Sequence, residues 1–423
     1  MEQEIYQEYI TILREELVPA MGCTEPIALA FAGAKCREVL GCMPDRVEVK
    51  ASGSIIKNVK SVIVPNTNKL RGIPVAIAAG IVGGKSDLQM QVIAEMEEDQ
   101  IAAIGKFVDT VPIKVEALDE GHVFDILAKL YHGEDCVTIR IMDYHTNIVY
   151  LEKNGEVLIE NLPEDTAISV DKEKKVLSMK GIWEFANTVK IEDVEDIIQQ
   201  QMDCNWAIAM EGMTNHYGAN IGKVLMNSYG KDTHNLACAM AAAGSDARMN
   251  GCEMPVVVNS GSGNQGMTVC LPVMVYAKTM RSPREKRIRA LVLSNLIAIY
   301  EKTGIGRLSA YCGAVSAGAA AAAGVAYLHD EDYETIIHTV VNALAASSGI
   351  VCDGAKASCA AKIALSVCSG LMGYEMYKRG QQFKAGDGLV AHGVEATLDN
   401  IAALASQGMY ETNLEIIRMM TQD

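Results

Sequence analysis

The sequence has few aromatic residues and no block of basic residues. Aromatic side chains make up 5% of the 423 residues, whereas hydrophobic residues as a whole make up 49%. The 37 Lys and Arg residues are outnumbered by 53 Asp and Glu residues, which gives a formal net charge of −16. A protein that binds nucleic acid by neutralising phosphates is therefore not expected. The small apolar side chains favour close-packed helices over an aromatic-rich β-sandwich.

The sequence also lacks a signal-peptide profile and a convincing membrane span. The chain starts with the acidic segment Met1-Glu2-Gln3-Glu4-Ile5 instead of a basic segment followed by an apolar one. Two uncharged windows, 254–277 and 308–328, are long enough to span a bilayer, but Gly, Ser, Ala and Asn are abundant in them. We therefore expect a cytoplasmic protein with no membrane partner.

The twelve cysteines include no close Cys-x-x-Cys pair. Such pairs are typical of structural zinc sites, so their absence argues against a site of that kind. In a reducing cytosol thiols stay free, and their retention indicates metal binding or catalysis. For any single cysteine the alternative is a small buried hydrophobic side chain.

Residues 1–44 are predicted to form two helices joined by a loop, which pack on the helical domain described below. Apolar residues recur every four positions from Ile5 to Leu17, and an Ala-rich helix is predicted over residues 27–40. Cys23 lies in the loop before this second helix. A helix N-terminus lowers the pKa of a thiol, so Cys23 is a candidate base or nucleophile, with a buried turn cysteine as the alternative.

Residues 45–170 are predicted to form an α+β domain with a small sheet. Alternating apolar and polar residues predict the strands, and turn residues separate them. Asn154-Gly155 between two apolar runs is a strong hairpin signal. The predicted strands cover residues 47–49, 59–64, 111–115, 137–141, 148–151 and 157–159, and the predicted helices cover residues 73–82 and 88–107.

Residues 171–423 are predicted to form an all-α domain that carries the catalytic and cofactor-binding residues. Strand patterns almost vanish beyond Lys172, and residues 176–189 and 191–210 have helical patterns. Ala/Gly-rich helices joined by glycine loops follow. The predicted fold class is therefore α+β, with an N-terminal mixed α/β domain that contains a small sheet and an Ala/Gly-rich all-α C-terminal domain.

The segment Asn259-Ser260-Gly261-Ser262-Gly263-Asn264-Gln265-Gly266 is rich in glycine and hydroxyl groups. Its spacing matches neither the Walker pattern nor the dinucleotide fingerprint, and no Lys-Ser/Thr follows Gly266. Backbone N–H groups and hydroxyls in such a loop suit a small carboxylate. A tight turn between packed helices is the alternative interpretation.

Cys312, Cys352 and Cys359 lie in or beside glycine-containing segments of the C-terminal half. A straight helix would separate Cys352 from Cys359 by about 10.5 Å, but Asp353-Gly354 breaks such a helix. A loop followed by a helix could bring these two thiols together, with Cys312 beside them. Three thiolates without an obvious fourth suit an iron–sulfur cluster with one open iron, and unrelated buried thiols are the alternative.

Pyridoxal phosphate (PLP) chemistry is not expected. It would need a lysine that forms a Schiff base, for which Lys356 is the candidate. No phosphate-binding partner accompanies this lysine.

Four motifs, in this order, resemble those of the L-cysteine desulfidase family. They are Gly22-Cys23-Thr24-Glu25-Pro26, the segment 259–266, Tyr311-Cys312-Gly313 and the segment 352–356, and the likeness spans nearly the whole chain. The C-terminal half is also similar, more distantly, to the α-domain of bacterial iron–sulfur L-serine dehydratases, although the interval between Cys352 and Cys359 is shorter here.

The resemblance implies an oxygen-sensitive 4Fe-4S cluster held by Cys312, Cys352 and Cys359, with Cys23 as a base or as an alternative ligand. It implies catalytic roles for Cys23, Thr24, Glu25 and Lys356. The residues implied for binding the carboxylate and amino groups of the substrate are Asn259, Ser260, Gly261, Ser262, Gly263 and Asn264.

The implied function is that of a cytoplasmic lyase for β-elimination of L-cysteine to pyruvate, ammonia and sulfide. L-serine dehydration by the same mechanism is the alternative, and a cluster-free structural or regulatory protein on the same scaffold is a second one. The expected partner is a small amino acid, L-cysteine or L-serine, and a homodimer is the expected assembly.

Overall fold

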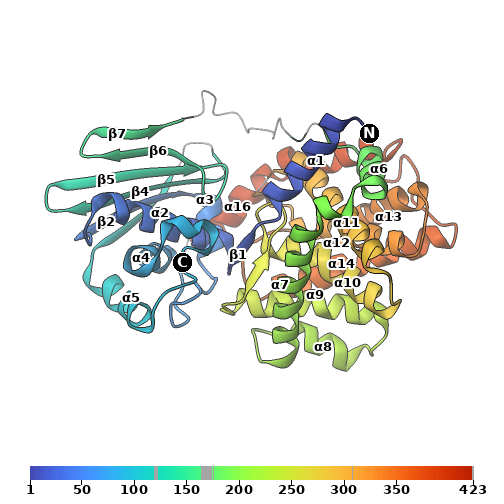
Figure 1. Cartoon of the computed structure of the whole chain (residues 1–423), viewed down its shortest axis with the longest axis horizontal. Helices are drawn as coiled ribbons and strands as arrows, with labels where there is room; N and C mark the ends of the chain where they lie inside the picture. Colours follow the sequence, from blue (N-terminus) through green and yellow to red (C-terminus); the bar gives the residue numbers. More distant parts are fainter. Residues whose placement is uncertain (119–121, 163–173, 175, 307, 422–423) are drawn as a thin grey trace.

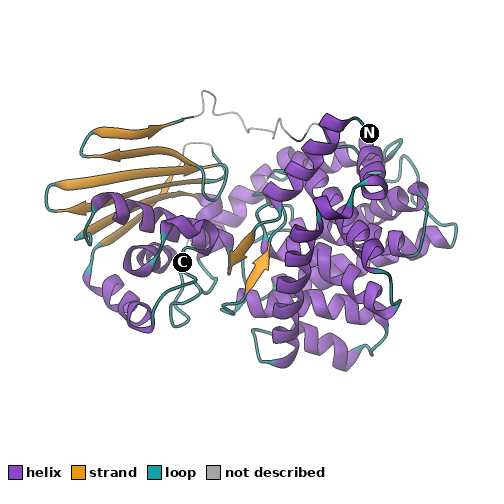
Figure 2. Cartoon of the chain, in the orientation of Figure 1, coloured by secondary structure: helices purple, strands orange, loops and turns teal. Residues whose placement is uncertain are grey.

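The computed structural model describes residues 1–118, 122–162, 174, 176–306 and 308–421. A sheet-containing part and a larger helical part lie side by side (Figures 1 and 2). This arrangement confirms the predicted α+β fold class. The predicted boundary between residues 170 and 171 lies outside the described residues.

The main sheet has six strands in the order β3-β2-β4-β5-β6-β7. β2 and β3 are parallel, and every other neighbouring pair is antiparallel. The hairpin predicted at Asn154-Gly155 is confirmed between β6 and β7, where both residues have positive φ as a tight turn requires. The strands are β2 (Arg46–Ser52), β3 (Ile113–Leu118), β4 (Asp125–His132), β5 (Asp135–Met142), β6 (Ile148–Lys153) and β7 (Glu156–Glu160).

Helices α2 and α4 cover one face of this sheet (Figure 1). The inward side chains alternate along the strands, as in β2, where Val47, Val49 and Ala51 are fully buried. Their core is separate from the core of the helical part. The helical elements of the sheet-containing part are α2 (Thr24–Leu40), α3 (Gly53–Val59), α4 (Ile73–Gly83), the 3-10 helix η1 (Ser86–Gln91) and α5 (Glu98–Thr110).

The helical part buries an Ala-rich core in which α12 is surrounded by α10, α11, α13 and α14. Small side chains let these helices approach closely. Among the described residues, no helix combines the length and the apolar character that a membrane span requires. The helices are α6 (Met179–Thr188), η3 (Ile191–Asp193), α7 (Glu195–Thr214), α8 (Ile221–Ser228), α9 (Thr233–Met249), α10 (Gly263–Thr279), α11 (Arg284–Ile305), α12 (Gly313–Leu328), α13 (Tyr333–Ser347), α14 (Cys359–Lys378), α15 (Val394–Ala403), η4 (Leu404–Gly408) and α16 (Tyr410–Thr421).

Both ends of the chain cross between the two parts. Helix α1 (Gln3–Glu16) packs with the core of the helical part, and the chain then enters the sheet-containing part at α2. In between, the short strand β1 (Pro19–Met21) pairs with β8 (Pro255–Val257). At the other end, α16 returns from the helical part to pack against α3, as Figure 1 shows.

Two predicted elements are wrong. Residues 59–64, predicted as a strand, contain the end of α3 and a loop, because Ile55 and Val59 recur at helical spacing and both are fully buried. The helix predicted over residues 88–107 is divided into η1 and α5, which begins only at Glu98. Glu97 and Gln100 form a capping box there, which starts a new helix.

Candidate functional site

Arg248 joins the N-terminal loop to the glycine-rich loop. Its Nε donates to the carbonyl oxygen of Gly22 over 2.9 Å, and its Nη1 donates to Oδ1 of Asn264 over 3.1 Å. The side chain is 3% exposed. The pairing of β1 with β8 holds the same two chain segments together. Residues more than 220 positions apart therefore share one buried guanidinium.

A backbone bridge brings Cys312 and Cys352 to one place. Tyr311 and Val351 form an isolated antiparallel bridge. The N–H of Cys312 donates to the oxygen of Ile350 over 3.1 Å, and the N–H of Cys352 donates to the oxygen of Ala310. The predicted loop-then-helix arrangement follows, with Cys359 as the first residue of α14.

One pocket is lined by all three of these cysteines. It has about 840 Å³ of empty space, including the part open to solvent, which exceeds the volume of a small amino acid. Its lining residues include Thr24, Glu25, Lys57, Arg248, Ser260, Gly261, Ser262, Asn264, Gln265, Cys312, Cys352 and Cys359.

Four helices present their N-terminal residues to this pocket. Thr24 begins α2, Asn264 is in the first turn of α10, Gly313 begins α12 and Cys359 begins α14. The first N–H groups of a helix have no partner inside the helix and carry a partial positive charge. Four such ends around one cavity favour a negatively charged occupant, such as a carboxylate or a thiolate-bound cluster.

Cys352 opposes the ionisation of the two other thiols, Cys312 and Cys359. Burial, followed by the nearby Cys352, raises the pKa of Cys312 to about 12. Burial also raises the pKa of Cys359, and Cys352 adds to this rise. Thiols that cannot all ionise alone are stabilised as thiolates by a cationic metal centre. This donor set therefore fits an iron–sulfur cluster.

A single metal ion fits less well. Among the residues that the structure describes, no group of three or more His, Cys, Asp or Glu side chains is arranged to hold a metal ion. A 4Fe-4S cluster would take each thiolate on a different iron, so its ligands would not need to lie as close together as those of one ion. The pocket thus brings Cys312, Cys352 and Cys359 to its wall without forming a compact metal-ligand group.

Lys57 is a pocket residue that the sequence analysis missed. It lies on α3 and is 1% exposed, and its Nζ donates to Oδ1 of Asn413 over 2.7 Å. Burial lowers its pKa, although Cys352 and Glu25 oppose this effect. A buried lysine with a lowered pKa can accept a proton. Its position between Ile55 and Val59, on the buried face of a helix, is the signal that could have identified it.

Arg248 was also missed, although its surroundings carried a signal. Residues 237–249 are mostly Ala, Gly and Met, and Asp246 and Arg248 are the charged residues among them. A charge within such a run has to be paired when the helix is buried. All residues from 237 to 249 are buried.

Cys23 does not line the pocket, whereas the next two residues of the sequence do. Thr24 and Glu25 line the pocket, and Glu25 Oε1 accepts a hydrogen bond from Asn58 over 2.9 Å. Cys23 is 1% exposed and contacts the Met249 sulfur over 3.7 Å. Burial raises its pKa to about 12, whereas the sequence predicted a lowered pKa. Desolvation of the thiolate outweighs the helix N-terminus.

Three of the predicted site residues support the wall of the pocket but do not line the pocket themselves. Lys356 forms an ion pair with Asp353 over 2.8 Å. Asn259 is buried and donates to Asn295, which holds the glycine-rich loop on α11. Gly263 lies against Arg248. The other residues of the predicted substrate loop, Ser260, Gly261, Ser262 and Asn264, line the pocket.

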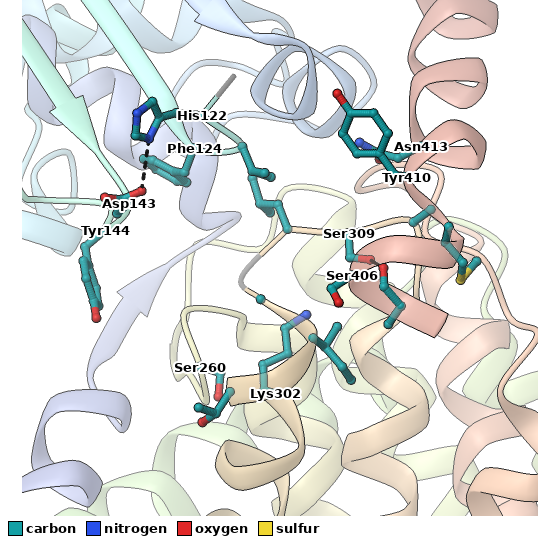
Figure 3. A pocket seen from close by; sticks show the side chains of 18 of the residues that line it. His122, Phe124, Asp143, Tyr144, Ser260, Lys302, Ser309, Ser406, Tyr410 and Asn413 are labelled. Carbon is teal, nitrogen blue, oxygen red and sulfur yellow. Dashed lines mark hydrogen bonds and ion pairs between the residues drawn. The ribbon is translucent and has the colours of Figure 1, made fainter. Parts of the chain in front are cut away.

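A second pocket adjoins the first and lies between the two parts of the chain (Figure 3). His122, Asp143 and Tyr144 line it from the sheet-containing part. Ser309, Ser406, Tyr410 and Asn413 line it from the helical part. Both pockets share the lining residues Ser260, Lys302, Leu308 and Ser309, so the two pockets adjoin one another.

Comparisons with known proteins place the chain in a family and give several relatives over its whole length. A family model described as serine dehydratase alpha chain matches residues 87–418. A UPF0597 protein of Desulfitobacterium hafniense is 54% identical over 415 residues, which cover 98% of this chain and 96% of the relative. A UPF0597 protein of Lachnoclostridium phytofermentans is 47% identical over 416 residues, covering 98% of this chain and all of the relative. One of Treponema denticola is 41% identical over 429 residues, covering 100% of both chains.

Proposed function

The chain belongs to the serine dehydratase alpha chain family, and from this premise we propose that it is a lyase that converts L-cysteine and water to pyruvate, ammonia and sulfide. The observation that carries the proposal is the meeting of three thiols and four helix N-termini in one pocket. A cytoplasmic location is part of the proposal. It is supported by the twelve cysteines, which are all free thiols.

We propose that Cys312, Cys352 and Cys359 hold a 4Fe-4S cluster. When bound, such a cluster with one open iron supplies a Lewis acid for the β-leaving group of the substrate. The helix N-termini at Gly313 and Cys359 support the negative charge of the bound thiolates.

The carboxylate of the substrate is proposed to bind at Arg248 and the N-terminus of α10. Arg248 is buried, so its charge acts on a carboxylate with little screening by water. Asn264 and Ser262 flank this position and offer polar groups for the amino group. The net charge of −16 repels a carboxylate overall, so the attraction has to come from these nearby groups.

Lys57 is proposed to remove the α-proton. Its lowered pKa leaves more of the neutral amine at neutral pH than an exposed lysine has, and the neutral amine accepts the proton. Loss of this proton and of the β-substituent gives aminoacrylate, which water converts to pyruvate and ammonia. Lys356 is the less suitable lysine because it is ion-paired with Asp353.

L-serine dehydration is a second candidate because the matching family model is described as serine dehydratase alpha chain. L-serine and L-cysteine differ only in the atom that leaves the β-carbon. Anaerobic purification followed by iron and sulfide analysis tests for the cluster. An anaerobic pyruvate assay with each amino acid tests the substrate.

We expect a brown, iron-containing protein that forms pyruvate and sulfide from L-cysteine faster than it forms pyruvate from L-serine. The reverse ratio of rates would assign the dehydratase activity. A protein that stays colourless and free of iron after anaerobic reconstitution would contradict the lyase and favour the structural or regulatory role. The homodimer remains a prediction, which light scattering on the purified chain would test.

A further inference from the structure

One buried side-chain oxygen in the wall of the cysteine-lined pocket has no hydrogen-bond partner among the described residues. It is Oε1 of Gln265, which lies in the first turn of α10, just after the glycine-rich residues 259–264. Gln265 lines the pocket and is 4% exposed. Burying an acceptor without a donor costs free energy, and such groups are rare in native structures. This oxygen therefore suits a ligand that brings an N–H or O–H group into the pocket.

The amide of Gln265 is held against the start of α12. A Cβ added at Gly313 would lie 2.6 Å from the amide carbon of Gln265 and 2.7 Å from its Oε1, so a side chain at position 313 would displace this amide. Gly313 follows Cys312, a proposed cluster ligand. Along α10, Gln265 follows Asn264, which accepts a hydrogen bond from Arg248. Gln265 thus connects the proposed carboxylate site with the proposed cluster site.

Several other polar groups of the wall are donors, or are acceptors that already have a partner. The four helix N-termini and the guanidinium group of Arg248 donate. Oε1 of Glu25 accepts a hydrogen bond from Asn58, and its Oε2 accepts one from Thr24. Oδ1 of Asn264 accepts from Arg248. A ligand that carries both a carboxylate and an ammonium group thus meets many donors for the first group, and needs an acceptor for the second.

We propose that Oε1 of Gln265 accepts a hydrogen bond from the α-ammonium group of the substrate. This inference rests on the proposed function, in which the carboxylate binds at Arg248 and the β-substituent faces the cluster. The α-carbon of an amino acid joins these two groups, so its ammonium group lies near the residue that connects their sites. Gln265 is then the residue that makes the site specific for amino acids over carboxylic acids without an amino group.

The specificity has a physical cause. An ammonium group restores the missing hydrogen bond of the buried oxygen, whereas an analogue with hydrogen at the α-position leaves the oxygen unpaired. An amide oxygen also suits this role because it accepts a hydrogen bond without any change of protonation.

L-alanine and propionate test this role, because they differ only in the α-ammonium group and neither has a β-leaving group. Isothermal titration calorimetry on the anaerobically reconstituted full chain measures both affinities without turnover. We expect the wild type to bind L-alanine at least about tenfold more tightly than propionate. In Gln265→Met, which removes the amide at similar length, this ratio should fall below about twofold.

Two further variants and a control support this measurement. Gln265→Glu keeps an acceptor and should keep the preference for L-alanine. Gly313→Ala leaves the glutamine in place but displaces its amide, so it should lower the ratio even where Gln265→Met is poorly folded. Gln200→Met, at an exposed position of α7, is the matched control and should bind like the wild type.

Equal binding of the two compounds by the wild type would overturn the inference. A preference that survives in both Gln265→Met and Gly313→Ala would assign the ammonium group to another residue and leave the proposed function standing. If the wild type bound neither compound, the proposed amino-acid substrate would itself be wrong, and the role of Gln265 would fall with it.

Discussion

The side-chain amine of Lys57 donates a hydrogen bond to the main-chain oxygen of Cys352 over 3.3 Å, across 295 positions of the sequence. The same amine donates to Asn413 on α16. One buried amine therefore connects the sheet-containing part, a proposed cluster ligand and the C-terminal helix. Lys57 also lines the pocket, so its charge would act on a ligand bound there.

Replacing Lys57 with Met should lower kcat by at least about 100-fold, since the α-proton would have no acceptor. The iron content should stay near that of the wild type. Activity of the wild type should rise with pH through the lowered pKa of Lys57, because only the neutral amine accepts a proton. Lys60→Met, one turn away at an exposed position, is the matched control. Full turnover in Lys57→Met would contradict the role of the lysine.

Replacing Cys312, Cys352 or Cys359 with Ala should each remove most of the bound iron after anaerobic reconstitution. With three cysteine ligands, a 4Fe-4S cluster would already have one iron without a protein ligand, so the loss of a further ligand would leave it weakly held. Iron analysis and the visible absorbance of the cluster measure this effect. Cys204→Ala removes a thiol outside the pocket and should keep normal iron. Unchanged absorbance in all three site variants would show that the ligand assignment is wrong.

Cys23→Ala should keep its iron and lose less than tenfold in kcat, because burial keeps this thiol neutral and it is not among the lining residues. A loss of about 1 kcal/mol in the free energy of unfolding is expected from the removed sulfur contact with Met249. Loss of iron would identify Cys23 as a ligand. Normal iron with lost turnover would identify it as the base.

Arg248→Lys should raise KM at least about tenfold and change kcat little. Lysine cannot reproduce the planar donors that hold Gly22 and Asn264, so carboxylate binding weakens by about 1.4 kcal/mol or more. Steady-state kinetics with the preferred amino acid separate the two constants. Arg281→Lys, at an exposed turn after α10, is the control. A fall in kcat with unchanged KM would exclude a role in binding the carboxylate.

Gly80→Ala should lower the free energy of unfolding by about 2 kcal/mol or more. A Cβ at Gly80 would lie 1.8 Å from the carbonyl oxygen of Ala30, so α4 could not stay this close to α2. At Gly105, on α5, the nearest atom would be 3.9 Å away. Gly105→Ala should therefore be neutral or stabilise by about 0.5–1 kcal/mol. Denaturant unfolding of both variants tests the close approach of α2 and α4.

Local patterns predicted the regular elements better than the site. The Asn154-Gly155 hairpin follows from two adjacent residues that tolerate positive φ, and the structure confirms it. The short apolar run at residues 59–64 was misassigned because a few apolar residues fit a strand and a buried helix equally well. The strand β1 was missed altogether, since its three residues pair with β8 more than 230 positions later.

By itself, the sequence determined the α+β class, the Ala-rich helices and the motifs that contain Cys312, Cys352 and Cys359. These features depend on neighbours within a few residues, where periodicity and turn chemistry act. Only the tertiary structure decided that Lys57 and Arg248 join these thiols and that Cys23 is buried beside Met249. Contacts between distant segments and the desolvation of a thiol depend on how the helices pack, and a local pattern does not encode that packing.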